Sequence, residues 1–318
     1  MIKILNCALK KREQIGEVKK TKNQEKSFFF IGKKIIALLV FIYATIFLSG
    51  CGKKEPAPTP KPELMIFASE ACKRPMDNLA LEYTKKTGVK LNFIYGGSGE
   101  ILSNLQTSGA GDIFIPSAND YIEIAKSKNL LSGDGAFTIS YLIPVVLVAK
   151  KNPKKIKALE DLAKKRVRVG IATPETVSIG MLSIEILDKN KLLKPVMKNT
   201  KIWPEQSVKV LSAVVNGIVD AVICWDFYGK WNSAEVTVIP IEKRKLPRIS
   251  CLSATLLKSS KHVKESNEFI KYLISEEGKN YFRKFGYSVD EKDAGNYAEL
   301  KLGSEYKLPD AYYKLINN

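Results

Sequence analysis

The sequence predicts an α/β fold with mainly parallel sheets, divided between two domains. The first observation is length, because 318 residues suggest two domains of ordinary size rather than one. The second is the alternation of short apolar runs with stretches of helical periodicity, which is typical of strand–helix units. The third is a composition of 45% hydrophobic and 26% charged residues, which indicates a globular chain. No internal repeat of fixed period is visible.

The expected elements succeed one another from residue 64 onward. Short apolar runs, one of them alternating with polar residues, predict strands over 64–68, 89–95, 112–116, 141–149, 167–172 and 220–224. Helical patterns predict helices over 75–87, 100–107, 120–128, 179–190 and 207–216. Gly88 comes after the first of these helices and is expected to end it.

The first 50 residues indicate export and form the expected signal peptide, 1–50. Lys33 and Lys34 precede the apolar run Ile35–Leu48, which is shorter than the roughly 20 residues of a membrane-spanning helix. Small residues come after the run, as they do before the cleavage site of a signal peptide. The final Leu-Ser-Gly-Cys resembles the bacterial lipobox, which implies cleavage before Cys51 and lipid attached to its sulfur. An uncleaved anchor helix is the alternative.

Residues 51–63 contain a Pro- and Lys-rich tether between this anchor and the body. Such a composition cannot pack a core and behaves as a semi-rigid spacer. We therefore expect an exported protein, lipid-anchored at the outer face of the cytoplasmic membrane or in the periplasm.

The net charge of +18 is compatible with nucleic acid, an anionic membrane or an anionic ligand as a partner. Residues 1–50 hold ten Lys/Arg against three Asp/Glu, and the remainder is still basic. The later basic residues are scattered, without an Arg-rich arm or an aromatic-interleaved basic motif. We therefore expect a solvated basic surface and no nucleic-acid partner.

The residues offer little for catalysis or metal binding. His262 is the only histidine, so the Ser–His pair of ordinary triad chemistry is missing. The cysteines lack Cys-x-x-Cys spacing, and no phosphate-loop or dinucleotide fingerprint is present. We expect no metal, no cofactor and no enzymatic activity. Cys72, Cys224 and Cys251 leave an odd number of thiols in the body, and no disulfide is assigned.

Six segments of the body are distinctive in their order and spacing, namely 67–77 (FASEACKRPMD), 95–105 (YGGSGEILSNL), 111–116 (GDIFIP), 174–180 (PETVSIG), 216–225 (NGIVDAVICW) and 270–286 (IKYLISEEGKNYFRKFG). Together they resemble the molybdate-binding family of type II periplasmic binding proteins. The resemblance implies two lobes joined by two crossover strands, with the ligand in the cleft between them. Lobe one is expected at 64–144 plus 248–318, and lobe two at 145–247.

The same resemblance implies a role in import. The chain would be a monomeric capture component of an ABC importer, closing its lobes over a molybdate- or tungstate-type oxyanion and presenting it to a membrane permease. A small dianion buried in protein must regain the hydrogen bonds that it had in water. Backbone N–H groups at helix starts and short hydroxyl bonds supply them. Four Gly- and Ser-rich turns fit this requirement, at 69–72, 97–99, 178–180 and 207.

The resemblance assigns roles at the two turns of lobe one. A binding serine of the family falls at Ala71, which lacks the hydroxyl. Ser69 or Cys72 is expected to substitute, or backbone N–H groups to serve alone. Ser98 matches a second binding serine, and Gly99 beside it permits close approach of the backbone.

In lobe two, the resemblance implies a backbone N–H donor at Ile179, with Gly180 beside it, and another at Ser207, whose hydroxyl could add a bond. Trp225 stands where the family commonly has a tyrosine, and its indole N–H can still donate to an oxyanion. The serines could equally be helix caps without a ligand, and Trp225 could be a core residue or part of the cleft wall.

Two other functions stay open. A protein of the same fold could bind an organic acid, a phosphate-like anion or a metal chelate. An Arg clamp would favour that function, and Arg74 and Arg248 are its candidates. An enzyme on the same scaffold could use Cys72 as nucleophile, and its thiol would then react rapidly with alkylating reagents at neutral pH.

Overall fold

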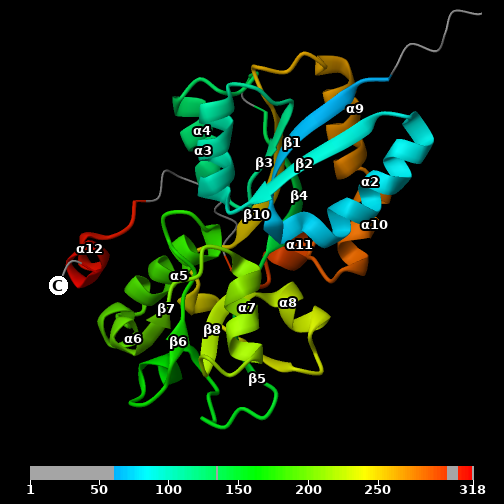
Figure 1. Ribbon diagram of the computed structural model, residues 1–318. Helices are drawn as coiled ribbons and strands as arrows, with labels where there is room; N and C mark the ends of the chain where they lie inside the picture. The colour runs from blue at the N-terminus through cyan, green and yellow to red at the C-terminus, as the bar shows by residue number, and fades with distance from the viewer. Residues whose placement is uncertain (1–60, 134, 299–306, 317–318) are drawn as a thin grey trace, which may run out of the picture. The chain divides into compact units, whose positions relative to one another are not determined.

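The computed structural model describes residues 61–133, 135–298 and 307–316. Over these residues the chain forms two five-stranded sheets flanked by helices (Figure 1). The expected signal peptide, the expected lipidation site at Cys51 and most of the expected tether lie outside the described residues. Among the helices that are described, none is long and apolar enough to cross a membrane.

The first sheet has the strand order β2-β1-β3-β10-β4. Its strands are β1 (Glu63–Ser69), β2 (Lys90–Gly96), β3 (Ile113–Ile115), β4 (Phe137–Leu142) and β10 (Ser250–Leu256). Its helices are η1 (Glu70–Cys72), α2 (Lys73–Thr87), α3 (Ser98–Ser108), α4 (Asn119–Ser127), α9 (Val263–Ile274), α10 (Glu276–Lys284) and α11 (Glu291–Ala294). In Figure 1, α3 and α4 lie on one side of this sheet, and α2, α9 and α10 lie on the other. This sheet and its helices are named lobe one.

The second sheet has the strand order β7-β6-β8-β5-β9. Its strands are β5 (Pro144–Ala149), β6 (Val169–Gly170), β7 (Thr200–Ile202), β8 (Ala221–Trp225) and β9 (Val236–Pro240). Its helices are η2 (Leu159–Ala163), α5 (Ser178–Lys189), α6 (Leu193–Asn199), α7 (Ser207–Val215), α8 (Asp226–Trp231) and η3 (Lys243–Lys245). This sheet and its helices are named lobe two. The exact expected bounds of the lobes stay a prediction.

The α/β fold is confirmed, but the expectation of mainly parallel sheets is wrong. Strand β1 runs parallel to β2 and β3, and β6 runs parallel to β7 and β8. Strand β10 is antiparallel to both of its neighbours, and so is β5. Both sheets are therefore mixed, because the strands that come after each crossover, β5 and β10, enter their sheets in the reverse direction.

The single strand expected over 141–149 is also wrong. Strand β4 ends at Leu142, β5 begins at Pro144, and the two strands belong to different sheets. Proline has no amide proton to give to a sheet ladder. Tyr141 pairs with Cys251 in lobe one, whereas Pro144 lies opposite Trp225 in lobe two. One unbroken apolar run therefore carries the first crossover, and residues 241–249 carry the second.

Helix α2 illustrates how local sequence and packing agree. Met76, Leu79 and Tyr83 recur at helical spacing, and all three are buried. The helix ends at Gly88, which adopts the left-handed conformation with φ 73° and donates its N–H to the carbonyl of Thr84. This is the end that the sequence predicts, since only glycine adopts such a φ at no steric cost.

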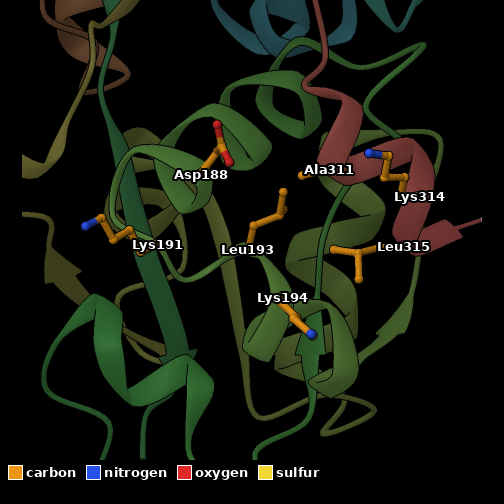
Figure 2. Close-up of a pocket in the computed structure, with 7 residues that line it drawn as sticks. All are labelled: Asp188, Lys191, Leu193, Lys194, Ala311, Lys314 and Leu315. Carbon is orange, nitrogen blue, oxygen red and sulfur yellow. The ribbon is translucent and has the colours of Figure 1, made fainter.

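Helix α12 (Asp310–Ile316) packs on α6 of lobe two, although the sequence placed residues 248–318 with lobe one. The ring of Tyr312 meets the ring of Trp203 edge-on at 6.2 Å, and its hydroxyl donates to Glu175 at 3.0 Å. A pocket of about 360 Å³ lies beside α12. In Figure 2, Leu193 lies across from Ala311 and Leu315 in this pocket. The pocket is also lined by Asp188, Lys191, Lys194 and Lys314.

Candidate functional site

Four serine hydroxyls meet at the contact between the lobes. The Oγ atom of Ser117 lies 2.9 Å from that of Ser69, 3.0 Å from that of Ser98 and 2.5 Å from that of Ser178. All four residues are buried. Three of them come from lobe one and Ser178 comes from lobe two. These four residues are named the serine cluster.

The parallel part of the first sheet brings these residues together. Ser69 ends β1 and Ser117 comes two residues after β3, and the carboxyl ends of adjacent parallel strands lie at one edge of a sheet. The amide of Ser117 donates to Ser98 Oγ at 3.0 Å, and Ser250 Oγ donates to the carbonyl of Ser117 at 2.6 Å. A hydroxyl has one proton and two acceptor sites, so three neighbouring hydroxyls fill the capacity of Ser117 Oγ.

A second polar contact joins the lobes at the start of α7. Glu70 Oε1 accepts from the backbone N–H of Ser207 and, at 3.0 Å, from the Ser207 hydroxyl. The Tyr228 hydroxyl lies 2.9 Å from the same Ser207 Oγ. Because Ser207 gives its only hydroxyl proton to Glu70, Tyr228 is the donor in that pair. Burial raises the pKa of Glu70 above its ordinary value, and the two bonds from Ser207 only partly oppose this effect.

Glycine is required where the backbones of the two lobes touch. The N–H of Gly99 donates to the carbonyl of Thr176 at 2.9 Å. A Cβ atom would lie 2.6 Å from the Thr176 carbonyl oxygen at Gly97, and 2.7 Å from the Glu175 carbonyl oxygen at Gly99. The close approach expected at Gly99 is thus made to lobe two. Thr176 Oγ1 is buried without a hydrogen-bond partner among the described residues.

Helix α5 begins at the serine cluster and is tightly seated. A Cβ atom on Gly180 would lie 2.3 Å from the carbonyl oxygen of Ala172, so this glycine serves close packing of the helix. Ile179 is fully buried. Its N–H belongs to the first turn, where backbone donors have no partner inside the helix. Its role as a donor to a ligand stays a prediction.

Of the substitutes expected for the missing hydroxyl at Ala71, Ser69 is the one in the serine cluster. Ala71 is buried, and its carbonyl accepts from the Tyr287 hydroxyl. Cys72 is also buried, and its thiol donates to the Ser69 carbonyl at 3.0 Å. Burial raises the pKa of the Cys72 thiol far above its ordinary value. This shift disfavours the thiolate that a nucleophile needs.

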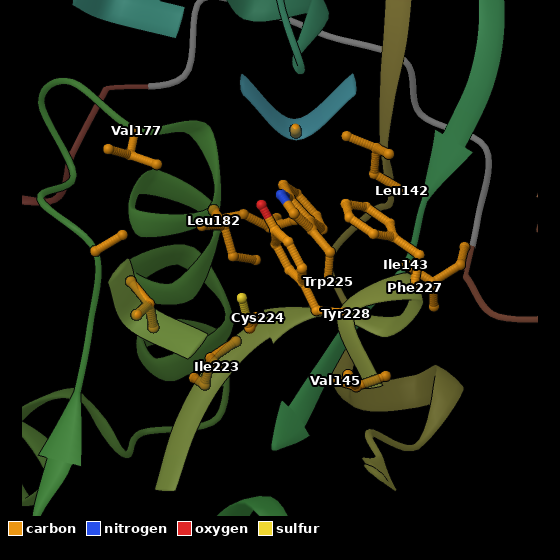
Figure 3. Close-up of a cluster of buried hydrophobic side chains, with 14 of the residues drawn as sticks. Leu142, Ile143, Val145, Val177, Leu182, Ile223, Cys224, Trp225, Phe227 and Tyr228 are labelled. Atoms are coloured by element: carbon orange, nitrogen blue, oxygen red, sulfur yellow. The ribbon is translucent and has the colours of Figure 1, made fainter. Parts of the chain in front are cut away.

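Trp225 ends β8 and is fully buried, within the apolar cluster of Figure 3 that includes Leu142, Val145, Leu182 and Phe227. The tyrosine hydroxyl that reaches the contact between the lobes comes instead from Tyr228, in the first turn of α8. Whether the indole of Trp225 contacts a ligand stays a prediction.

Sequence reasoning missed three residues of this region: Ser117, Tyr228 and Glu70. Ser117 comes directly after the predicted strand 112–116, at the strand end where binding residues are expected in α/β proteins. Tyr228 was visible as the nearest tyrosine after Trp225. Glu70 lies in the candidate turn 69–72, but the sequence did not indicate its partner, because only the packing of the lobes brings it to Ser207.

The two arginines considered for an organic-acid clamp are engaged elsewhere. Arg248 is buried and pairs with Asp120 at 2.6 Å and with Glu185 at 2.8 Å. Arg74 lies over the ring of Trp231 at 4.5 Å. Within the described residues, no hydrogen bond of the serine cluster involves a Lys or Arg side chain. The same residues contain no group of three or more His, Cys, Asp or Glu side chains that could hold a metal ion.

Comparison with known proteins gives relatives that are matched over nearly their whole length. "Putative binding protein" of Haemophilus influenzae is 24% identical over 255 residues, covering 80% of this chain and 98% of that protein. "Putative ABC transporter substrate-binding lipoprotein YvgL" of Bacillus subtilis is 24% identical over 262 residues, covering 81% and 99%.

Among solved structures, the "substrate binding domain of putative molybdenum ABC transporter from Clostridium difficile" is 23% identical, with a TM-score of 0.58 over 73% of this chain and 100% of that one. This likeness shows a shared fold. The model of a family described as bacterial extracellular solute-binding protein matches residues 64–288, which include nearly all of both lobes. Two lobes that meet at a buried hydroxyl cluster suit the binding of a solute better than catalysis. The chain belongs to this family of bacterial extracellular solute-binding proteins.

Proposed function

We propose that this protein is the capture component of an ABC importer and that its ligand is a small tetrahedral oxyanion of the molybdate or tungstate type. The serine cluster carries the proposal. It brings four buried hydroxyls from both lobes to one point without a Lys or Arg side chain bonded to it. Closure of the lobes over the anion would assemble these donors and exclude water.

Neutral hydroxyls are well suited to a buried dianion. Each bond from a hydroxyl to a charged oxygen is worth about 1.5–3 kcal/mol, and a tetrahedral anion offers oxygens in every direction. Helices α3 and α5 begin at Ser98 and Ser178. Their first N–H groups carry partial positive charge, which favours an anion without the need for a full countercharge.

The comparisons support the role in transport, but they do not specify the ligand. The relative from Bacillus subtilis is named as a substrate-binding lipoprotein of an ABC transporter, and the Clostridium difficile domain as part of a molybdenum transporter. By analogy we propose a lipid anchor on Cys51 and a membrane permease as the partner. Replacement of Cys51 by Ala should abolish incorporation of labelled fatty acid and release the protein from the membrane. A lipidated Cys51→Ala variant would contradict the anchor.

An organic acid, a phosphate-like anion or a metal chelate is the alternative ligand class. One observation favours a ligand that brings its own hydrogen-bond donor, namely the carboxylate of Glu70, which follows Ser69 of the serine cluster in the chain and accepts from Ser207. Against an organic acid, Arg248 and Arg74 are already paired as described.

The decisive experiment is a calorimetric and tryptophan-fluorescence titration of the body from Cys51 onward, with Cys51 replaced by Ser. Molybdate, tungstate, sulfate and inorganic phosphate are added separately at one pH and salt concentration. We expect saturable binding of molybdate or tungstate and little response to sulfate. No binding of any of these anions would overturn the oxyanion proposal. Small-angle scattering should show a smaller radius of gyration with the bound anion.

A further inference from the structure

Glu70 is an acidic side chain close in sequence to a cluster whose Oγ atoms bond to other hydroxyls and to backbone N–H groups. It comes directly after Ser69 of the serine cluster in the chain. It uses the backbone N–H and the hydroxyl of Ser207, at the start of the nine-residue helix α7. These are donors that a bound oxyanion would otherwise attract.

The charge of Glu70 sets a condition on any anion held by the serine cluster. Like charges repel more strongly where water is excluded than in solvent, and the repulsion grows as they approach. A single proton removes the conflict, because it turns one of the two acceptors into a hydrogen-bond donor for the other. The buried position of Glu70 already favours its protonated form relative to an exposed glutamate.

The ionisable groups around Glu70 do not supply a countercharge that would make this proton unnecessary. Glu100, in the first turn of α3, opposes ionisation of Glu70, and Lys209 on α7 favours it as the weakest of the five contributions. From β8 and α8, Cys224 and Tyr228 face Glu70 as neutral groups, because burial raises their pKa values, to about 12 for Cys224 and well above 10.0 for Tyr228. From α2, Arg74 lies close enough to act on Tyr228 but is stacked on Trp231.

We propose that Glu70 makes anion capture proton-linked, so that the complex holds one proton shared between the Glu70 carboxyl and the bound oxyanion. The inference rests on the proposed function and names the regulation of the same site. Molybdate carries no proton at neutral pH, so its capture takes one proton from solvent onto Glu70. Monohydrogen phosphate brings its own proton and donates it in a hydrogen bond to the ionised Glu70, without exchange with solvent.

The test is calorimetric titration with molybdate, and separately with inorganic phosphate, in two buffers of different ionisation enthalpy. The protein is the Cys51→Ser body, and the pH is mildly alkaline, where phosphate is mainly the monohydrogen dianion. We expect uptake of about one proton per molybdate and close to none per phosphate. The Kd for molybdate should rise about tenfold per pH unit once Glu70 is ionised in the free protein.

Two matched variants separate Glu70 from general effects of charge. Glu70→Gln keeps the acceptor for Ser207 and removes the charge, so molybdate should bind without proton uptake and with an affinity independent of pH. Glu205→Gln removes an exposed charge two residues before Ser207 and should retain the proton uptake of the parent protein. If Glu70→Gln fails to fold, the number of protons taken up per molybdate and the pH dependence of the Kd, both measured on the parent protein, still test the role of Glu70.

The outcomes distinguish this inference from the proposed function. Binding of molybdate without proton exchange and with a pH-independent Kd would overturn the role of Glu70 and leave the oxyanion function standing. Failure of both the parent protein and Glu70→Gln to bind any of the anions would overturn both. Binding of molybdate by Glu70→Gln alone at alkaline pH would support both.

Discussion

The serine cluster and the ion triad of Arg248 both join the lobes through buried polar groups, but they differ in charge. The triad links Arg248, on the second crossover, to Asp120 of α4 in lobe one and Glu185 of α5 in lobe two. A single guanidinium serves two carboxylates, so Asp120 and Glu185 both depend on Arg248 for their countercharge. The hydroxyls of the serine cluster can reverse donor and acceptor roles when their partner changes. The triad is therefore suited to holding the lobes together, and the serine cluster to exchanging its bonds for those of a ligand.

The largest effect is expected from breaking the triad. Arg248→Met would leave Asp120 and Glu185 without their buried countercharge and should lower the free energy of unfolding by about 3–5 kcal/mol. The measurement is urea and thermal unfolding. The control is Arg244→Ala, which removes an exposed pair with Glu242 and should cost about 0–1 kcal/mol. Equal losses in the two variants would show that the triad has no special role.

A smaller effect, confined to ligand affinity, is expected from the serine cluster. Ser98→Ala and Ser117→Ala should each weaken oxyanion binding by about 1–3 kcal/mol. Ser117→Ala should cause the larger loss, because this hydroxyl contacts three others. Calorimetry measures the affinity of both variants. The control is Ser212→Ala, which changes an exposed residue of α7. Unchanged affinity in Ser117→Ala would remove this residue from the site.

A still smaller effect is expected from the ionisation of Glu70 on the pH dependence of folding stability. Its pKa is raised in the folded protein, so its contribution to stability is fully present below its unfolded pKa and is lost as the pH rises through the folded pKa. The melting temperature of Glu70→Gln, measured relative to the parent protein, should therefore increase over this window and then level off. A constant difference at every pH would mean that Glu70 titrates normally.

The smallest effect is expected when the native protein is treated with thiol reagents, because its cysteines should hardly react. Cys72, Cys224 and Cys251 are buried and free of disulfides. Burial raises the pKa to about 12 for Cys224 and about 11 for Cys251, and still further for Cys72. In the Cys51→Ser body, the three thiols should resist labelling at neutral pH and react fully in denaturant. Rapid labelling of Cys72 in the native protein would reopen the possibility of a nucleophile.

Local sequence predicted many of the elements between residues 64 and 225, because each depends on a periodicity or an end signal within a few residues. Helix α2 with its end at Gly88 is one example, and the start of α7 at Ser207 is another. The prediction of one strand over 141–149 was wrong because apolar composition does not indicate which sheet a strand joins. Only the pairings of Tyr141 and Pro144 with partners far along the chain separate β4 from β5.

For the candidate site, the sequence by itself determined that hydroxyl-bearing turns come after strands, and it pointed to Ser69, Ser98 and Ser207. The tertiary structure decided which of these groups meet. It placed Ser117 at the centre of the serine cluster, brought Tyr228 rather than Trp225 to Ser207, and set Glu70 on the start of α7. The physical reason is the separation of the residues along the chain. Helix starts are encoded locally, whereas a contact between Glu70 and Ser207 exists only when the two lobes pack together.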